Sequence, residues 1–540
     1  MVASLASSLP VRGIVVALSL LALLVALPAC EGEGERPLKT PTTAVGTPSP
    51  IRSAVDLASA AADLTVFGAD AGDYLADRFS LAQGDFNGDG KADLLVGAPL
   101  ADGPENSRMN AGEAYVILGS GDIEGTLDLA SAKADMTIFG ASDGDNLGFV
   151  VASGDINGDG TDDILVGARF ASPDGGRSQA GEAYVILGSS SLSQSVDIAL
   201  GQQDLTVAGA EASDYLGYGL ASGDIDGDGV EDLIVVAPGA DGLNNGRQNA
   251  GEAYVVLGSP ELSGTIDVGQ DQQDFTILGA EADDLLANFA ASGDLNGDGR
   301  DDILLGTHKA DGPDNQRPDG GEAYVIPGSQ EPKGTLDLAS GKGFLTVWGG
   351  EASDWLGFFL AAADVNGDQE DDLIVSARNA DGLDNSRNNC GEVYLIFGSS
   401  ELPKSVDIAL GQQDATLIGA DLNDLFGHSL ASGDLNGDDI ADVLVGAPAA
   451  DSVQNSRPDG GEVRAFFGSP SWPTVVDSAL GQQSVVIWGR EEGDELGFSL
   501  ASGDIDGDGK ADIIGGALLA DGPDDARPDA GEAYVILSVP

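Results

Sequence analysis

The chain has 540 residues, and its 90 Asp and Glu residues against 24 Lys and Arg give a formal net charge of -66 at pH 7. A surface this acidic repels nucleic acid and anionic lipid and attracts cations and basic partners, so nucleic acid is excluded as a partner. Hydrophobic residues make up 42% of the chain, which is enough for a folded core and argues against disorder.

Residues 1–30 are typical of a signal peptide, because an apolar run over residues 13–29 follows Arg12 and ends at Cys30. Residues 27–30 (LPAC) resemble a bacterial lipobox, which implies diacylglyceryl transfer to the thiol of Cys30 and cleavage before it. On this interpretation the protein is exported to the bacterial cell surface or outer envelope and attached to the membrane by lipid alone. A plain signal peptide with a chance Cys is the alternative.

Residues 31–52 are rich in Pro, Thr and Gly and have no apolar period, which is typical of a flexible tether. Residues 53–57 (SAVDL) and 63–68 (DLTVFG) then indicate a strand that precedes the first complete repeat. This strand belongs to no complete repeat.

Seven acidic segments recur 69 or 70 residues apart, and each opens with an aspartate: Asp85, Asp155, Asp224, Asp294, Asp364, Asp434 and Asp504. Each copy has four strand-like stretches. The seventh copy shows three of them, at residues 498–504, 512–518 and 532–537, and residues 126–129 followed by 135–140 exemplify the fourth. Four strands at this period predict an all-β, seven-bladed β-propeller of four-stranded blades over residues 53–540.

The last copy stops after its third strand at residues 532–537. We therefore predict that the N-terminal strand completes the last blade and closes the ring, because closure removes exposed sheet edges. A monomer is expected. Cys390 replaces the Ala of a repeated segment and is expected to be a small buried thiol without a disulfide partner.

The acidic segments follow the pattern D-x-[DN]-x-D-G-x-x-D, which resembles the opening of an EF-hand loop without its twelfth-position Glu. Oxygens at positions one, three, five and nine, with the backbone carbonyl of position seven, can surround a cation of calcium size. Gly at position six permits the positive φ of a sharp turn. About seven Ca²⁺ ions are therefore predicted. The alternative is that the loops are solvated Asx-turns.

The predicted ligands, copy by copy, are Asp85, Asn87, Asp89, Lys91 and Asp93; Asp155, Asn157, Asp159, Thr161 and Asp163; Asp224, Asp226, Asp228, Val230 and Asp232; Asp294, Asn296, Asp298, Arg300 and Asp302; Asp364, Asn366, Asp368, Glu370 and Asp372; Asp434, Asn436, Asp438, Ile440 and Asp442; Asp504, Asp506, Asp508, Lys510 and Asp512. Gln369 and Asp439 replace the glycine in copies five and six. These two sites are expected to be weaker.

Phe67-Gly68, the acidic loops and Gly97-Ala98-Pro99 together resemble the FG-GAP repeats of integrin α-subunit propellers and related bacterial surface proteins. The resemblance implies that the metal loops join the first and second strands on one face, and that ligands meet the opposite face. Copies four and five depart from it, with residues 306–308 (GTH) and 376–378 (SAR) in place of GAP.

An arginine recurs in all seven copies, with a Glu five residues after it, and we interpret the pair as an architectural brace. The arginines are Arg108, Arg177, Arg247, Arg317, Arg387, Arg457 and Arg527. Tyr74, Tyr215 and Trp355 vary among the copies on loops of the expected ligand face and could stack on sugars or anchor a protein. Packing within their own blades is the alternative.

These features predict a calcium-binding module for adhesion or for a protein or glycan ligand at the cell surface, not an enzyme. With only two histidines, His308 and His428, the chain has no Ser-His-Asp order and no HExxH motif. A polysaccharide-acting propeller enzyme and a calcium-stiffened structural spacer are the alternatives.

Overall fold

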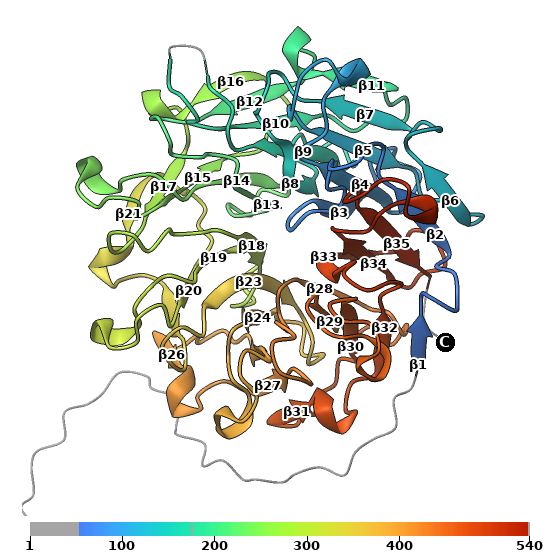
Figure 1. Cartoon of the computed structure of the whole chain (residues 1–540). Coiled ribbons are helices and arrows are strands. Elements are labelled where there is room, and N and C mark those ends of the chain that lie inside the picture. Colours follow the sequence, from blue (N-terminus) through green and yellow to red (C-terminus); the bar gives the residue numbers. More distant parts are fainter. Residues whose placement is uncertain (1–52, 174–175, 538–540) are drawn as a thin grey trace, which may run out of the picture. The chain divides into compact units, whose positions relative to one another are not determined.

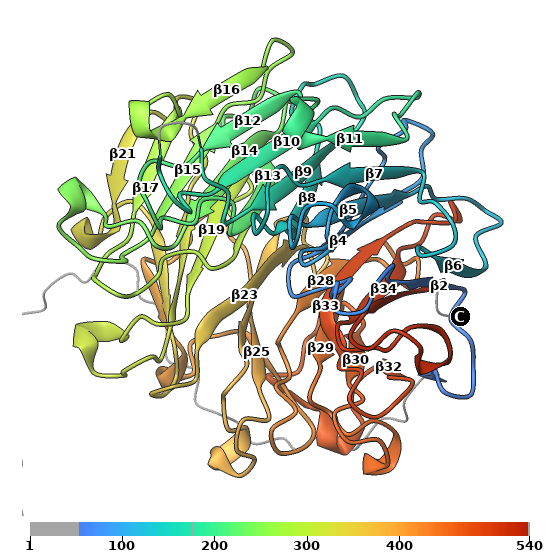
Figure 2. The same cartoon turned by 45° about the horizontal axis from the view of Figure 1, so that its top comes forward.

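The computed structural model describes residues 53–173 and 176–537, and these form seven β-sheets arranged as blades around a central axis (Figures 1 and 2). The predictions for residues 1–52, including the signal peptide, the lipobox and the tether, lie outside this part of the chain. Within it, no helix is long and apolar enough to cross a membrane. The predicted all-β, seven-bladed propeller is confirmed.

In every blade the first strand lies nearest the axis and the fifth forms the outer edge. Blade 1 contains β3 (Leu81–Gly84), β4 (Asp93–Ala98), β5 (Glu113–Ile117), β7 (Met136–Phe139) and β11 (Ser195–Asp197). Blade 2 contains β8 (Leu147–Gly154), β9 (Asp163–Ala168), β10 (Glu182–Ile186), β12 (Leu205–Ala208) and β16 (Gly264–Asp267). Blade 3 contains β13 (Gly219–Gly223), β14 (Asp232–Ala237), β15 (Glu252–Val256), β17 (Phe275–Leu278) and β21 (Gly334–Asp337).

Blade 4 contains β18 (Ala290–Gly293), β19 (Asp302–Thr307), β20 (Glu322–Ile326), β22 (Leu345–Trp348) and β26 (Ser405–Asp407). Blade 5 contains β23 (Leu356–Ala363), β24 (Asp372–Ala377), β25 (Glu392–Ile396), β27 (Ala415–Ile418) and β31 (Val475–Asp477). Blade 6 contains β28 (Leu430–Gly433), β29 (Asp442–Ala447), β30 (Glu462–Phe466), β32 (Val485–Trp488) and β1 (Ser53–Asp56). Blade 7 contains β33 (Leu496–Gly503), β34 (Asp512–Ala517), β35 (Glu532–Ile536), β2 (Leu64–Phe67) and β6 (Gly125–Asp128).

Helical structure in the described residues is limited to single turns of 3-10 helix. Six lie between the second and third strands of a blade: Pro104–Asn106, Leu243–Asn245, Pro313–Asn315, Leu383–Asn385, Val453–Asn455 and Pro523–Asp525. Five follow a fifth strand: Ile198–Leu200, Val268–Gln270, Leu338–Ser340, Ile408–Leu410 and Ser478–Leu480.

The core lies between neighbouring blades. The second strand of every blade is buried along its whole length, because its two faces are covered by the adjacent blades. One cluster, for example, packs Leu95 and Val116 of blade 1 against Ile164 and Val166 of blade 2. Cys390 is fully buried, as predicted, and is a free thiol within residues 53–173 and 176–537.

Each sheet has a fifth strand that the sequence did not predict. The four expected strands pair antiparallel, and the fifth adds to the outer edge in parallel, as β6 does to β2 and β11 to β7. Residues 126–129 and 135–140 were expected to act together as one fourth stretch. Instead β6 joins the preceding blade and β7 completes its own. Copies one to six each contribute one strand to the blade before them in this way, and β1 takes this place for the seventh.

The predicted closure is confirmed by the strand pairing. β2 pairs antiparallel with β35, with Leu64 opposite Val535 and Phe67 opposite Glu532. β1 in turn supplies the parallel edge strand of blade 6 by pairing with β32. The first two strands of the described chain therefore complete its last two blades.

The glycines of the FG and GAP motifs allow close contact between backbones. A Cβ on Gly97 would lie 2.0 Å from the carbonyl oxygen of Gly148 in blade 2. A Cβ on Gly68 would lie 2.1 Å from the carbonyl oxygen of Ala530. Any side chain at either position would separate these segments, which gives the recurring glycines a steric explanation.

Candidate metal loops and the opposite face

The acidic loops all lie on one face of the ring. Each begins where the first strand of a blade ends and finishes at the first residue of the second strand, as with Gly223 at the end of β13 and Asp232 at the start of β14. The first strands run in the same sense in every blade, so the seven loops share one edge (Figures 1 and 2). This arrangement agrees with the placement that the resemblance implied.

Each loop is organised by the carboxylate at position one. In blade 3, Oδ1 of Asp224 accepts a hydrogen bond from the backbone N–H of Asp228 at 3.0 Å, and Oδ2 accepts one from Gly229 at 2.9 Å. Oδ1 of Asp228 accepts a hydrogen bond from the backbone N–H of Val230 at 3.0 Å. Gly229 has a φ of 89°, so position six has the left-handed conformation expected of it.

Gln369 and Asp439 adopt the same turn without glycine. Their φ values are 74° and 64°, and the backbone N–H of each still donates to the position-one carboxylate at 2.8 Å. The loop fold of copies five and six is therefore kept, with backbone strain at these two residues. Their weaker affinity for metal stays a prediction.

The carboxylate at position nine is buried in every loop. Asp232 is 1% exposed, and its two oxygens accept backbone N–H bonds from Ile225 at 3.0 Å and Gly258 at 2.8 Å. Burial raises the pKa of this carboxyl to about 7, with the nearby Asp226 charge adding to the effect. Burial likewise raises the pKa to about 7 at Asp93, Asp163, Asp302, Asp372 and Asp442.

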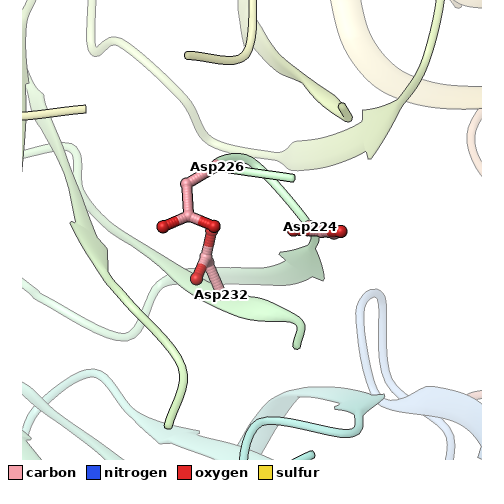
Figure 3. Close-up of side chains that lie close together, drawn as sticks. All are labelled: Asp224, Asp226 and Asp232. Carbon is pink, nitrogen blue, oxygen red and sulfur yellow. The ribbon is translucent and has the colours of Figure 1, made fainter. Parts of the chain in front are cut away.

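In two loops, three carboxylates converge. Figure 3 shows Asp224, Asp226 and Asp232, each of which offers an oxygen within 4.8 Å of the others, and Asp504, Asp506 and Asp512 form the equivalent group in blade 7. Where position three is Asn, its amide instead donates to the position-nine carboxylate, as Asn366 does to Asp372 at 2.9 Å. In blade 4, Oδ2 of Asp302 is buried without a hydrogen-bond partner. A group of carboxylate oxygens with one buried member fits a hard cation such as calcium, and so does the unsatisfied buried oxygen of Asp302.

On the opposite face, the sevenfold arginines form ion pairs, as the sequence predicted, but with a different partner. The pairs are Arg108–Asp197, Arg177–Asp267, Arg247–Asp337, Arg317–Asp407, Arg387–Asp477, Arg457–Asp56 and Arg527–Asp128, at 2.6–2.8 Å. Each aspartate ends the parallel fifth strand of the same blade and so comes from the following copy or from β1. The Glu five residues after the arginine instead accepts a hydrogen bond from a tyrosine in most copies, as Glu113 does from Tyr115 at 2.5 Å.

A second sevenfold aspartate lies before each first strand on this face. In six copies its carboxylate accepts a hydrogen bond from the backbone N–H three residues earlier, as Asp145 does from Ser142 at 2.9 Å. Burial raises the pKa to about 7 at Asp73, Asp284, Asp424 and Asp494, and to about 6 at Asp145, Asp214 and Asp354. We call these seven residues the rim aspartates.

Because of the rim aspartates, we expect the free energy of unfolding of the metal-free ring to be higher at pH 5 than at pH 8. Their folded pKa values lie above the ordinary 3.8, so the folded state holds protons that the unfolded state has released. This stabilisation is complete below about pH 4 and is lost as the pH rises through 6 to 7. In chelator, we expect Tm to fall by on the order of 5 °C from pH 5 to pH 8.

Asp145→Asn should reduce this slope because the amide keeps a hydrogen-bond acceptor without a charge. Asp122→Asn, at an exposed residue, is the matched control and should leave the slope unchanged. Calorimetry across the pH range provides the measurement. A Tm that rises towards pH 8 would contradict the prediction.

The three predicted ligand-face aromatics are half-buried residues with positive φ, at 55° for Tyr74, 60° for Tyr215 and 62° for Trp355. The ring of Tyr215 packs edge-on against Phe170 at 5.7 Å. The ring of Trp355 lies 5.1 Å from that of His308. These contacts favour packing for Tyr215 and Trp355, and a direct ligand contact by any of the three stays a prediction.

Comparison with known proteins supports the repeat assignment. Residues 79–117, 147–186, 216–256, 287–326, 426–466 and 496–536 match the FG-GAP repeat. These segments fall in blades 1, 2, 3, 4, 6 and 7. Blade 5 is the copy in which residues 376–378 replace GAP and Gln369 replaces the loop glycine. The ring is thus a propeller that carries FG-GAP repeats.

Two kinds of curated protein resemble the chain. The phosphatidylinositol-glycan-specific phospholipase D of Homo sapiens is 28% identical over 405 residues, which are 69% of this chain and 43% of that protein. The Dictyostelium discoideum protein of the same name is 27% identical over 62% of this chain and 35% of its own length. Integrin alpha-PS2 of Drosophila melanogaster is 27% identical over 44% of this chain and 16% of its own length. The chain therefore spans less than half of each of these relatives.

Proposed function

We propose that this protein is a calcium-binding module of the cell surface that binds a protein or glycan ligand through the face opposite its metal loops. The observation that carries the proposal is the division between the two faces. One face repeats the same acidic loop seven times, whereas the residues around the axis on the other face differ from copy to copy.

Calcium would be held by the loop oxygens at positions one, three, five and nine and by the carbonyl of position seven. The buried position-nine carboxylates support this assignment, because uncompensated buried negative charge is costly and a divalent cation would offset it. Bound ions would brace the inner strands from one face. The arginine–aspartate pairs hold the outer edge from the other face.

A binding role is favoured over catalysis. Both histidines lie among aromatic rings: the half-buried His308 is near Trp355 and the buried His428 is near Phe498. The relatives with an enzymatic name match this chain over less than half of their own length. A propeller enzyme acting on polysaccharide and a calcium-stiffened spacer are the competing functions.

Export and lipid attachment through Cys30 complete the proposal. The apolar segment before Cys30 and the four residues 27–30 support it. The high negative charge also suits a surface protein that must not adhere to anionic lipid around it. The protein is proposed to act as a monomer.

A binding screen tests the proposed function. Full-length protein with calcium is applied to a glycan array and to immobilised envelope extract, in parallel with chelator-treated protein and with protein reloaded with calcium or magnesium. We expect binding that chelator abolishes and calcium restores. Magnesium should restore little, because it requires stricter octahedral geometry and retains its water.

Two other outcomes would contradict the proposal. Release of soluble sugar from a bound polysaccharide would establish the enzyme instead. Absence of binding to every glycan and extract, in protein shown to hold calcium, would favour the structural spacer.

A further inference from the structure

A cluster of aromatic and basic side chains lies at the end of the central axis that is remote from the metal loops. Its Phe, Tyr and Trp members and one histidine stand at or near the start of the inner strands. Two arginines and the other histidine follow second strands, and the third arginine belongs to a two-residue insertion in blade 1. We call the following residues the pore-mouth cluster: Arg78, Phe149, Arg169, Tyr218, His308, Trp355, Phe358, Arg378, His428 and Phe498.

The cluster is closed beneath by three phenylalanines. The rings of Phe289 and Phe359 stack at 3.9 Å, and Phe79 lies 5.5 Å and 5.9 Å from them. These rings and Arg78 also line the central channel, a cavity of about 360 Å³ whose other walls are mainly small residues of the inner strands. A ligand at the pore mouth would therefore rest on an aromatic floor.

Three arginines of this cluster have no carboxylate partner. In the described residues every other arginine forms an ion pair, whereas Arg78, Arg169 and Arg378 form none. Their guanidinium groups lie over aromatic rings instead. The central carbon of Arg169 is 3.4 Å from the ring centre of Phe149, and those of Arg378 and Arg78 are 3.9 Å and 5.3 Å from that of Phe358.

Several polar atoms of the cluster are unsatisfied. The Nε atoms of Arg78, Arg169 and Arg378 are buried without partners, and so is Nε2 of His428, a residue that is 2% exposed. Burial, reinforced by the neighbouring Arg78 charge, lowers the pKa of Arg378 to about 9. A guanidinium nitrogen of Arg378 lies 2.9 Å from Nδ1 of His428. This contact and the cation–π contacts still leave the buried Nε atoms without partners, so part of the cost of these buried charges is uncompensated.

Few other charged groups are available to offset the arginines. Burial lowers the pKa of His308 to about 3 and that of His428 well below 6.5, so both rings are neutral at pH 7. Lys309 lies 3.6 Å from Asp319 and has its own partner. Asp77 is the acidic group nearest to Arg78, and its backbone neighbour Arg78 donates an N–H to it at 2.6 Å. The Asp77 carboxylate thus faces Arg78 and Arg169, and Arg378 lacks a carboxylate of its own among the described residues.

We propose that the pore mouth is a binding site for a carboxylate group, which would be held by the guanidinium groups of Arg78 and Arg378 with Arg169 beside them. A guanidinium presents paired N–H donors that match the two oxygens of a carboxylate. Arg78 and Arg378 share the ring of Phe358 and are only partly buried, so both reach one ligand from the open side.

The surrounding charge selects a ligand with an isolated carboxylate. The chain has a net charge of -66, so a polyanion such as nucleic acid would be repelled over most of its length. A single acidic group on an otherwise neutral ligand would meet only the basic cluster. The half-buried ring of Trp355, with Lys309 Nζ 4.2 Å from its centre, extends the site sideways.

This inference deepens the proposed binding function by naming the chemistry of its ligand. It is tested by calorimetric titration of the full-length, calcium-loaded protein with sodium glucuronate and with N-acetylglycine. Glucose and N-acetylglycinamide are the matched neutral probes. We expect both carboxylates to bind with a Kd on the order of 1 mM and both neutral probes to be at least tenfold weaker.

Arg378→Met and Arg78→Met should each weaken carboxylate binding roughly tenfold, because methionine keeps an apolar stem and removes the charge. Lys342→Met removes one positive charge from an exposed residue away from the cluster and should leave the affinity unchanged. Tighter binding of glucuronate would identify an acidic sugar as the source of the carboxylate. Equal binding would show recognition of the carboxylate alone.

The inference is overturned if neither carboxylate binds the wild-type protein, a result that does not depend on the folding of any variant. It is also overturned if both arginine variants bind as tightly as the wild type. Failure of this titration would leave the macromolecular screen unaffected. Failure of the screen would leave the small-molecule titration interpretable, so the two proposals can fail separately.

Discussion

Removal of calcium is expected to lower the Tm of the ring by on the order of 10 °C. Each loop brings several carboxylates together, and without bound cations the repulsion among them in a chain with a formal charge of -66 opposes compaction. Calcium binds the folded loops in preference to the unfolded chain, and one site stabilises by about 2.7 kcal/mol at a concentration 100 times its Kd. Calorimetry in chelator, followed by calcium titration, measures both Tm and the number of ions.

Paired variants separate coordination from charge repulsion. Asp159→Ala should reduce the calcium-dependent gain in Tm more than Asp368→Ala, because Gln369 already strains the loop of Asp368. Monovalent salt should recover only part of the loss caused by chelator, since salt screens repulsion without supplying ligands. A Tm unchanged by chelator at low ionic strength, in protein shown to be free of metal, would identify the loops as simple Asx-turns. Binding of three ions or fewer would refute seven sites.

Deletion of residues 53–68 is expected to abolish the cooperative unfolding of the ring. The deletion removes β1 and β2, which complete blades 6 and 7 and bury Leu57, Leu64, Val66 and Phe67. Loss of these four side chains would cost on the order of 5–10 kcal/mol. It would also expose the edges of β32 and β35, and exposed edges promote aggregation. Chemical denaturation and light scattering report the two effects.

The matched control deletes the same number of residues immediately upstream, residues 37–52, which the sequence indicates to be a linker. This variant should unfold as the wild type does. A point substitution, Val66→Asp, provides a milder test, because Val66 is fully buried between β35 and β6. Wild-type stability after deletion of residues 53–68 would show that the strand pairing does not close the ring.

Much of the architecture could be predicted because it depends on local spacing. The recurrence of Asp85 and its equivalents fixed the number of blades, and the unpaired N-terminal strand implied closure. The turn at position six followed from the glycine pattern, and the positive φ of Gln369 and Asp439 shows that the loop hydrogen bonds impose it even without glycine. Predicting these features requires only the residues of one copy and the spacing between copies, not the contacts that each residue makes with other copies.

Features that depend on contact between copies were missed. The sequence places Arg108 close to Glu113, but its partner is Asp197 in the next copy, which only the parallel fifth strand brings near. Arg378 and His308 were visible only as departures from GAP. Nothing in the linear repeat indicates that such residues, from separate blades, meet Arg78 at the axis. A repeat pattern predicts the strands and turns of one copy, but it does not predict which side chains of different copies meet at the central axis.

The parallel fifth strand that each blade takes from outside its own copy has a topological consequence. At every pair of neighbouring blades, a strand joins the preceding blade, and the aspartate at its end pairs with an arginine of that blade. The same holds where β1 joins blade 6 and β6 joins blade 7. The ring therefore has no privileged first blade. A circular permutant would join residue 537 to residue 53 and begin at an equivalent connection between two other blades. Such a chain would form the same set of contacts.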